Sequence, residues 1–122
     1  MGANAFLDGE GPAQVTQFGD PRSCARFEWR QSAAERVIRA SGEIDMSNSG
    51  DLALGIEGLG ERRLTVDLTE VTFIDSTGLR GLVGLAESIA PRRLSLRINQ
   101  GSQIDRLLVI TALDDIFVIS RH

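Results

Sequence analysis

Apolar and polar residues alternate over much of this chain, and the spacing of the apolar positions predicts most of its secondary structure. Residues 64–69 alternate with a period of two, which indicates a half-buried strand. Over residues 79–89 the apolar positions recur every three or four residues, which indicates one face of an α-helix. Asp75-Ser76-Thr77-Gly78 lies between them, where a helix begins. The run therefore predicts a strand, a short loop and a capped helix that Pro91 ends.

Further strands and helices are expected on both sides of this run. Alternation around Phe27 and Trp29 predicts a strand that begins near Cys24, and residues 36–44 form a second apolar-rich strand. The turn between these two strands is short, so they pair antiparallel. Later patterns predict a strand over 94–98, a helix over 104–111 and a strand over 116–119.

Glycines mark two of the expected helices. The helix that follows residue 48 contains several glycines, which weaken it, and Ser47 or Asn48 is its expected cap. In the helix after Ser76, Gly81 and Gly84 lie three residues apart near the polar flank. Such a pair permits close approach of another backbone, either within the domain or across a partner interface.

The order of elements, β-β-α-β-α-β-α-β, predicts the fold class. Each helix lies between strands that run parallel, as right-handed crossovers. The strands over 64–69 and 94–98 alternate in polarity, whereas parallel strands covered on both faces are apolar along nearly their whole length. We therefore expect an α/β protein with a mixed, mostly parallel sheet and helices mainly on one face.

The first residues show no sustained period. Residues 1–22 are rich in Gly, Ala and Gln and contain Pro12 and Pro21, so they are predicted to form a flexible N-terminal extension. Docking of Val15 and Phe18 on the domain is the alternative. Residues 23–122 are then expected to be one domain, which fits the length of the chain.

Composition narrows the function classes. The net charge is -4 and the basic residues are scattered arginines, which argues against direct binding of nucleic acid. A patch formed by Arg80, Arg92, Arg93 and Arg97 is the alternative to a solvated face. No apolar run approaches the ~20 residues of a membrane span, so no membrane insertion is expected. The single cysteine and the absence of a secretory pattern fit a cytoplasmic protein.

Candidate catalytic chemistry is sparse. The only histidine is the last residue, His122, so a nucleophile–His–acid triad is not expected. The sequence contains neither a Walker-type phosphate loop nor a dinucleotide fingerprint, and no acidic cluster has metal-ligand spacing. Glu43 and Asp45 flank a strand end, where acidic side chains are typically solvated. We therefore predict no catalytic residues, no metal and no cofactor.

Ser76 has a structural and a functional interpretation. As a helix cap it would contribute about 1 kcal/mol; alternatively Asp75 is the cap and Ser76 the first helical residue. Phosphate would add about −1.5 to −2 charges at pH 7, which a helix N-terminus tolerates. Modification would therefore alter an interface rather than unfold the domain.

The same stretch resembles a known family. Val66-Asp67-Leu68, followed by Val71-Thr72-Phe73-Ile74-Asp75-Ser76-Thr77-Gly78-Leu79, is similar to the signature of the STAS domain, the fold of bacterial anti-sigma factor antagonists. Gly42-Glu43-Ile44-Asp45 and the segment from Leu107 to Asp114 fit the same family. The extension of about 22 residues and the lack of a short helix after the last strand depart from its usual form.

The resemblance implies a function and a set of site residues. Unphosphorylated, the protein would bind an anti-sigma factor that is also a serine kinase, and phosphorylation of Ser76 would release it, which regulates transcription indirectly. The expected partner-binding residues are Asp45, Asp75, Ser76, Thr77, Gly78 and Arg80. The alternatives are a STAS subunit of a transporter-associated or stressosome-like assembly, in which Ser76 is only a cap, and a module that binds a small ligand or nucleotide. The sequence predicts no oligomeric state.

Overall fold

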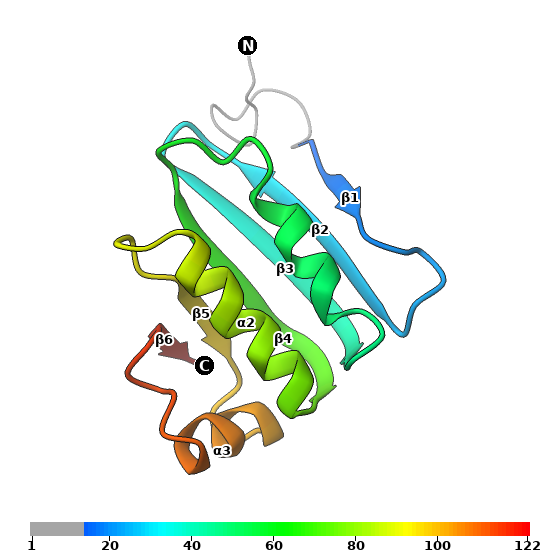
Figure 1. The fold of residues 1–122 in the computed structure, drawn as a ribbon, viewed down its shortest axis with the longest axis vertical. Helices are drawn as coiled ribbons and strands as arrows, with labels where there is room; N and C mark the ends of the chain where they lie inside the picture. Colours follow the sequence, from blue (N-terminus) through cyan, green and yellow to red (C-terminus); the bar gives the residue numbers. More distant parts are fainter. Residues whose placement is uncertain (1–13) are drawn as a thin grey trace.

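A computed structural model describes residues 14–122 and shows a six-stranded sheet with helices packed on it (Figure 1). The strands lie in the sheet in the order of the sequence, with β1, β2 and β3 antiparallel and β3 to β6 parallel. The strands are β1 (Thr16–Phe18), β2 (Ala25–Gln31), β3 (Glu35–Ile44), β4 (Arg63–Ile74), β5 (Ser95–Ile98) and β6 (Val118–Arg121). The helices are the 3-10 helix η1 (Ser49–Ile56) and the α-helices α2 (Ser76–Ser88) and α3 (Gln103–Ile110). The predicted α/β class with a mixed, mostly parallel sheet is confirmed.

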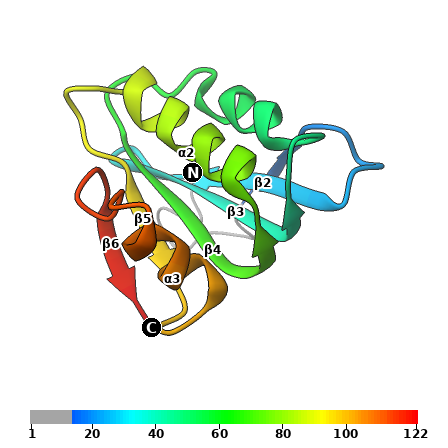
Figure 2. The same cartoon turned by 60° about the horizontal axis from the view of Figure 1, so that its bottom comes forward.

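The core lies between the sheet and its helices. Helices η1 and α2 run side by side over one face of the sheet, and α3 lies near the end of β5 (Figures 1 and 2). Within β3 and β5 the buried apolar residues occupy alternate positions, as the period of two predicts. No helix of the described residues is long and apolar enough to span a membrane.

The face of the sheet away from η1 and α2 carries a row of alternating charges. Glu28, Arg39, Asp67 and Arg97 are neighbours in register across β2, β3, β4 and β5. Arg97 Nη1 on β5 lies 3.8 Å from Asp67 Oδ2 on the adjacent strand β4. These residues line part of a shallow hollow of about 270 Å³. Opposite charges on adjacent strands pair favourably, so this face is polar without a helix to cover it.

The structure places a strand inside the segment that was expected to be a flexible extension. Strand β1 pairs with β2, and the Phe18 ring stacks on the Phe27 ring with centroids 5.6 Å apart. Three residues are too short a strand for a visible sequence period, which is why the pattern did not predict it. Regular structure therefore begins before the expected boundary at residue 23. Residues 1–13 of the expected extension lie outside the described residues.

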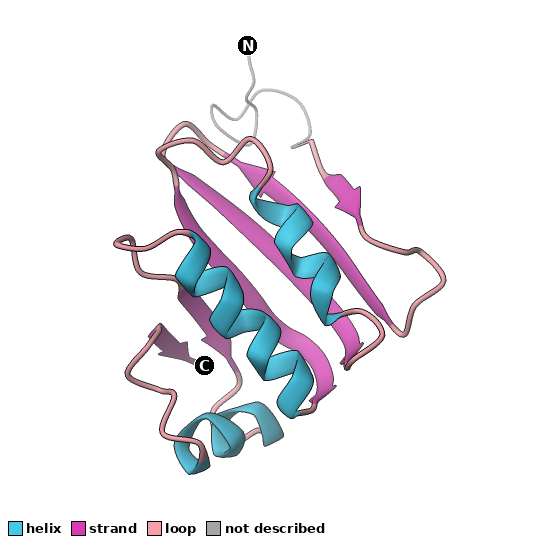
Figure 3. Ribbon diagram, in the orientation of Figure 1, coloured by secondary structure: helices cyan, strands magenta, loops and turns pink. Residues whose placement is uncertain are grey.

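The first helix is a 3-10 helix rather than an α-helix, and neither expected cap residue caps it. Asn48 occupies the N-cap position but its side chain makes no capping hydrogen bond. Gly55 is buried in this helix, and a Cβ there would lie 2.6 Å from Ile38 Cδ1 and 2.9 Å from Phe18 Cζ. The lack of a side chain at this position therefore lets the helix pack closely against Ile38 and Phe18. Figure 3 shows η1 beside α2.

The two glycines of α2 have different environments. A Cβ at Gly81 would lie 3.0 Å from the Ser49 carbonyl oxygen, so Gly81 permits the close approach of η1 within the domain. A Cβ at Gly84 would have no neighbour within 4 Å. Gly81 therefore allows a close approach within the domain, which is the first of the two alternatives. Gly84 makes no such close contact with the described residues.

Helix α3 is anchored to the rest of the domain by Asp105. This buried carboxylate accepts hydrogen bonds from Gly101 N at 2.8 Å and from Arg121 Nε at 2.9 Å, so it joins α3 to β6. The Gly101 bond, followed by the Arg121 bond, holds the pKa of Asp105 below its ordinary value of 3.8.

The depressed pKa predicts how this anchor depends on pH. The stabilisation by ionised Asp105 is present above pH 3.8 and is lost as the pH falls through the folded-state pKa. We expect Asp105→Asn to lower the melting temperature at pH 7, and expect the difference from wild type to shrink below pH of about 4. Thermal unfolding of both proteins across the acid range measures it. A difference that stays constant down to the lowest pH would contradict this role of the charge.

Candidate functional site

The candidate site lies where the carboxyl ends of β3 and β4 meet. These strands are parallel, and Ile44 is the register partner of Ile74. Asp45 and Asp75 follow these two residues directly, and Asp75 N donates a hydrogen bond to the Ile44 carbonyl at 3.3 Å. The two expected carboxylates are therefore presented at the same edge of the sheet.

Asp75, rather than Ser76, caps helix α2. Its Oδ1 accepts a hydrogen bond from Gly78 N at 2.7 Å, and its own backbone is extended. Ser76 is then the first helical residue, and it is exposed. The second of the two cap assignments offered by the sequence is thus the correct one. It leaves the Ser76 hydroxyl at the surface, at the positive end of the helix dipole.

The loop after β3 holds Asp45 by two kinds of contact. Asp45 Oδ1 accepts hydrogen bonds from the Ser47 hydroxyl at 2.6 Å and from Ser47 N at 2.9 Å. These bonds, the side-chain bond first, hold the pKa of Asp45 below its ordinary value, so it is ionised at neutral pH. The buried Asn48 side chain donates to Glu43 O at 2.9 Å and accepts from Asp45 N at 3.0 Å. Asn48 therefore braces this loop instead of capping η1.

The remaining expected site residues differ in their accessibility. Arg80 is exposed and Thr77 is half-buried. Gly78 is buried, because α2 packs closely on the ends of β3 and β4 at this point. A Cβ at Gly78 would lie 2.7 Å from both the Ile44 carbonyl oxygen and Ile74 Cγ1. Gly78, one of the expected partner-binding residues, is therefore not exposed at the helix start, and its lack of a side chain lets the helix approach the sheet.

The close contact at Gly78 and the open space at Gly84 predict opposite effects when each glycine is replaced by alanine. Gly78→Ala is expected to lower the free energy of unfolding by about 2 kcal/mol, because the new methyl group is forced against a backbone carbonyl. Gly84→Ala is expected to raise it by about 0.5 kcal/mol, because alanine favours a helix and the position is open. Urea denaturation of both variants tests the prediction. Equal effects on stability would contradict it.

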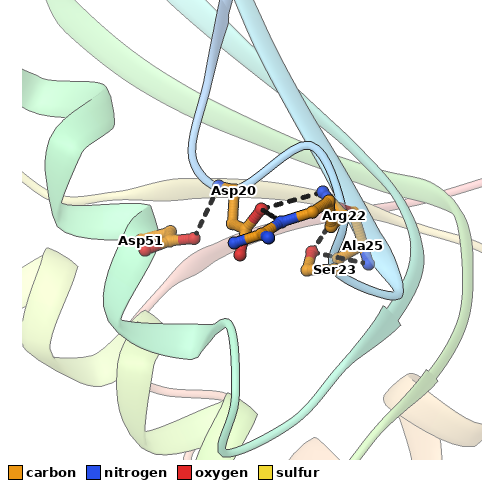
Figure 4. Close-up of polar contacts among 5 residues, drawn as sticks. All are labelled: Asp20, Arg22, Ser23, Ala25 and Asp51. Atoms are coloured by element: carbon orange, nitrogen blue, oxygen red, sulfur yellow. Dashed lines mark hydrogen bonds and ion pairs between the residues drawn. The ribbon is translucent and has the colours of Figure 1, made fainter.

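The loop between β1 and β2 reaches the first turn of η1, which the sequence did not predict. Figure 4 shows Asp51 of η1 accepting a hydrogen bond from Asp20 N, at 3.1 Å. Asp20 Oδ1 in turn accepts from Arg22 N at 2.9 Å, and Ser23 Oγ donates to Ala25 O at 2.7 Å. The bond between residues 31 positions apart ties the N-terminal loop to the helix that follows Asp45.

The arginines considered as a basic patch serve different parts of the fold. Arg92 Nη1 donates to the carbonyls of Gly60 and Arg62, both at 2.7 Å. Arg93 Nη2 donates to Asp115 O at 2.6 Å, whereas Arg97 lies against Asp67 on the open face. Arg92, Arg93 and Arg97 therefore contact different loops and strands, whereas Arg80 is exposed near the start of α2. Among residues 14–122, no group of three or more acidic, His or Cys residues could hold a metal ion.

Comparison with known proteins assigns the family. Residues 27–119 match the family model described as "Mlab, STAS domain". The chain belongs to the STAS domain family. Because this match spans most of the chain, the expected family is confirmed.

Curated relatives and a solved structure agree with this assignment. The chain is 35% identical over 86 residues to the anti-sigma-B factor antagonist of Listeria monocytogenes, a match that covers 67% of this chain and 75% of that protein. It is 32% identical over 94 residues to the anti-sigma-B factor antagonist of Bacillus subtilis, covering 75% and 86%. The fold matches the crystal structure of an anti-sigma factor antagonist from Mycobacterium paratuberculosis with a TM-score of 0.62 and 23% identity, covering 89% and 87%. None of these names is that of an enzyme.

Proposed function

We propose that this chain is an anti-sigma factor antagonist, and that phosphorylation of Ser76 controls its binding to an anti-sigma factor. The unmodified protein binds the partner through the surface around Ser76, Asp45, Asp75, Thr77 and Arg80. The partner is also the serine kinase, and it modifies Ser76 and is then released. The exposed Ser76 hydroxyl at the start of α2 carries this proposal. The regulated pair would act in the cytoplasm, where sigma factors work.

The chemistry of modification requires little from this chain. The Ser76 oxygen attacks the γ-phosphorus of ATP, the bond to the β-phosphate bridging oxygen breaks, and ADP leaves. The hydroxyl proton goes to a base on the kinase. This chain supplies only an accessible hydroxyl on a rigid helix start, which fits a substrate and binding partner rather than an enzyme.

The electrostatics of the site explain how phosphate would end binding. The N-terminus of α2 offers partial positive charge, so phosphate is tolerated by the domain itself. Asp75 directly precedes Ser76, and Asp45 follows Ile44, the register partner of Ile74, so the added charge joins two carboxylates at the same edge of the sheet. A partner that buries this surface would have to desolvate a strongly anionic group. Release follows without any large change in the fold.

A direct binding experiment tests the proposal. The purified chain, mixed with a candidate anti-sigma factor at micromolar concentration, should elute with it as one complex on gel filtration. Addition of ATP and Mg²⁺ should separate the two proteins. A complex that forms equally with and without ATP would instead favour the alternative of a STAS subunit in a larger assembly. Failure to bind any anti-sigma factor of the source bacterium would contradict the proposal.

A further inference from the structure

The last part of β4 has no neighbouring strand on its β5 side. β4 continues to Ile74, whereas β5 pairs only with Thr65 to Asp67. Side-chain amides occupy part of the free edge instead. Asn99 Nδ2 donates to Thr69 O at 2.8 Å. Beyond it, Gln103 makes two bonds to a single residue: Nε2 donates to Ile74 O at 2.7 Å, and Oε1 accepts from Ile74 N at 3.1 Å.

The pair of bonds from Gln103 resembles the pairing of a neighbouring strand. A carboxamide presents one acceptor and a donor group side by side, as a peptide backbone does. On its other side Ile74 is the register partner of Ile44, and Asp75 N bonds to Ile44 O. The residue that precedes the cap of α2 is therefore held from both sides.

Helix α3 presents Gln103 from a rigid position. Gln103 is its first residue, and the preceding Ser102 caps it by accepting from Asp105 N at 3.3 Å. Ile104 and Leu108 are buried in the core. Asp105 is bonded to Arg121 of β6. Because α3 is fixed at these points, the Gln103 side chain transmits its position to the end of β4.

We propose that Gln103 is a positioning residue for the phosphorylation of Ser76. Its amide fixes Ile74, and through Ile74 the Asp75 cap and the Ser76 hydroxyl, in the arrangement that the kinase meets. Without the two hydrogen bonds from Gln103, the junction between β4 and α2 occupies several conformations. Only a fraction of the molecules can then dock on the kinase. The apparent affinity then falls by that fraction. This inference rests on the proposed function, since it concerns the same serine.

Gln103→Met isolates the two hydrogen bonds. Methionine is close to glutamine in length and in helix propensity, but it cannot replace the bidentate contact with Ile74. We expect the KM for phosphorylation by the anti-sigma factor kinase to rise about tenfold, with kcat within about twofold of wild type. Gln100→Met is the matched control, because Gln100 is exposed in the loop three residues earlier. That variant should keep the KM of the wild-type chain.

Hydrogen exchange provides a readout that does not need the kinase. The Ile74 amide proton is bonded to the Gln103 side chain, so it should exchange at least about tenfold faster in Gln103→Met. The Arg63 amide, which donates a hydrogen bond to Ala34 O at the opposite end of β4, serves as the internal reference. If the methionine variant does not fold, Gln103→Glu replaces it, because the carboxylate can still accept from Ile74 N and suits a helix N-terminus. It cannot donate to Ile74 O, so an intermediate KM is expected.

The outcomes separate this inference from the proposed function. If wild type is phosphorylated on Ser76 and Gln103→Met has the same KM, the positioning role is overturned. A purely structural role would lower the melting temperature but leave the KM of the folded protein unchanged, which also overturns it. If wild type accepts no phosphate on Ser76, the proposed function fails. Separately from any kinase assay, an Ile74 amide that exchanges at the same rate in Gln103→Met and in wild type would show that Gln103 does not hold Ile74.

Discussion

Ser76→Asp is expected to lower the affinity for the anti-sigma factor by at least about a hundredfold, whereas Ser76→Ala should bind as well as wild type. An uncompensated charge buried in an interface costs about 3–5 kcal/mol, and a factor of ten in affinity corresponds to about 1.4 kcal/mol. The new carboxylate would also lie beside Asp75, the cap of the same helix. Alanine removes only an exposed hydroxyl. Titration calorimetry on the three proteins measures the difference.

Ser88→Asp is the matched control for this prediction. Ser88 is exposed at the last turn of α2, about 18 Å along the helix from Ser76. It receives the same change of charge without entering the proposed interface. Affinity should stay within about threefold of wild type, since surface charges this far apart are largely screened. If Ser76→Asp binds as tightly as Ser88→Asp, the surface around Ser76 is not the docking surface.

Arg36→Met is expected to cause the largest loss of stability, about 3 kcal/mol in the free energy of unfolding. Arg36 is 1% exposed, and its Nη1 donates to the carbonyls of Gly55 and Glu57 at 2.7 Å each. The guanidinium also lies 3.7 Å from the centre of the Trp29 ring. Methionine fills a similar space but leaves both carbonyls at the end of η1 without their donor, which costs about 1–3 kcal/mol per group.

The charge of Arg36 is not balanced by a carboxylate in these contacts. Burial, and then the nearby Arg62 charge, lower the pKa of Arg36, yet a guanidinium remains protonated at neutral pH. Arg39→Met, at an exposed position of the same strand, is the control and should change stability by less than about 1 kcal/mol. Urea unfolding of both variants tests the comparison. A loss below about 1 kcal/mol for Arg36→Met would show that the carbonyls find other donors.

Hydrophobic periodicity predicted the strand–helix order but not the full length of β4. The two-residue period holds from Leu64 to Leu68, and this half of the strand was predicted. Register shifts between Arg39 and Ser41, and between Gly42 and Glu43, then change which β4 residues face the core. Irregular pairing breaks the alternation, so residues 70–74 carried no strand pattern. A local pattern cannot reveal a strand whose phase changes along its length.

The geometry of the candidate site was predicted where it depends on neighbouring residues in the sequence, and it was missed where it depends on packing. Adjacent ends of parallel strands bring Asp45 and Asp75 to one edge, and local cap chemistry places Ser76 at a helix start. The burial of Gly78 follows from how closely α2 approaches β3, which no spacing records. Gln103 acts on Ile74 from 29 residues away. A bond between a side-chain amide and a distant backbone has no sequence signature.

The most direct test of the proposed switch is to locate the phosphate. The full chain would be incubated with its anti-sigma factor kinase and Mg-ATP, and the products mapped by mass spectrometry, with Ser76→Ala in parallel. The proposed function predicts one phosphate per chain on Ser76, none on Ser76→Ala, and loss of the complex as the phosphate is incorporated. Phosphate on another residue, or a phosphorylated Ser76 that remains bound to the partner, would contradict it.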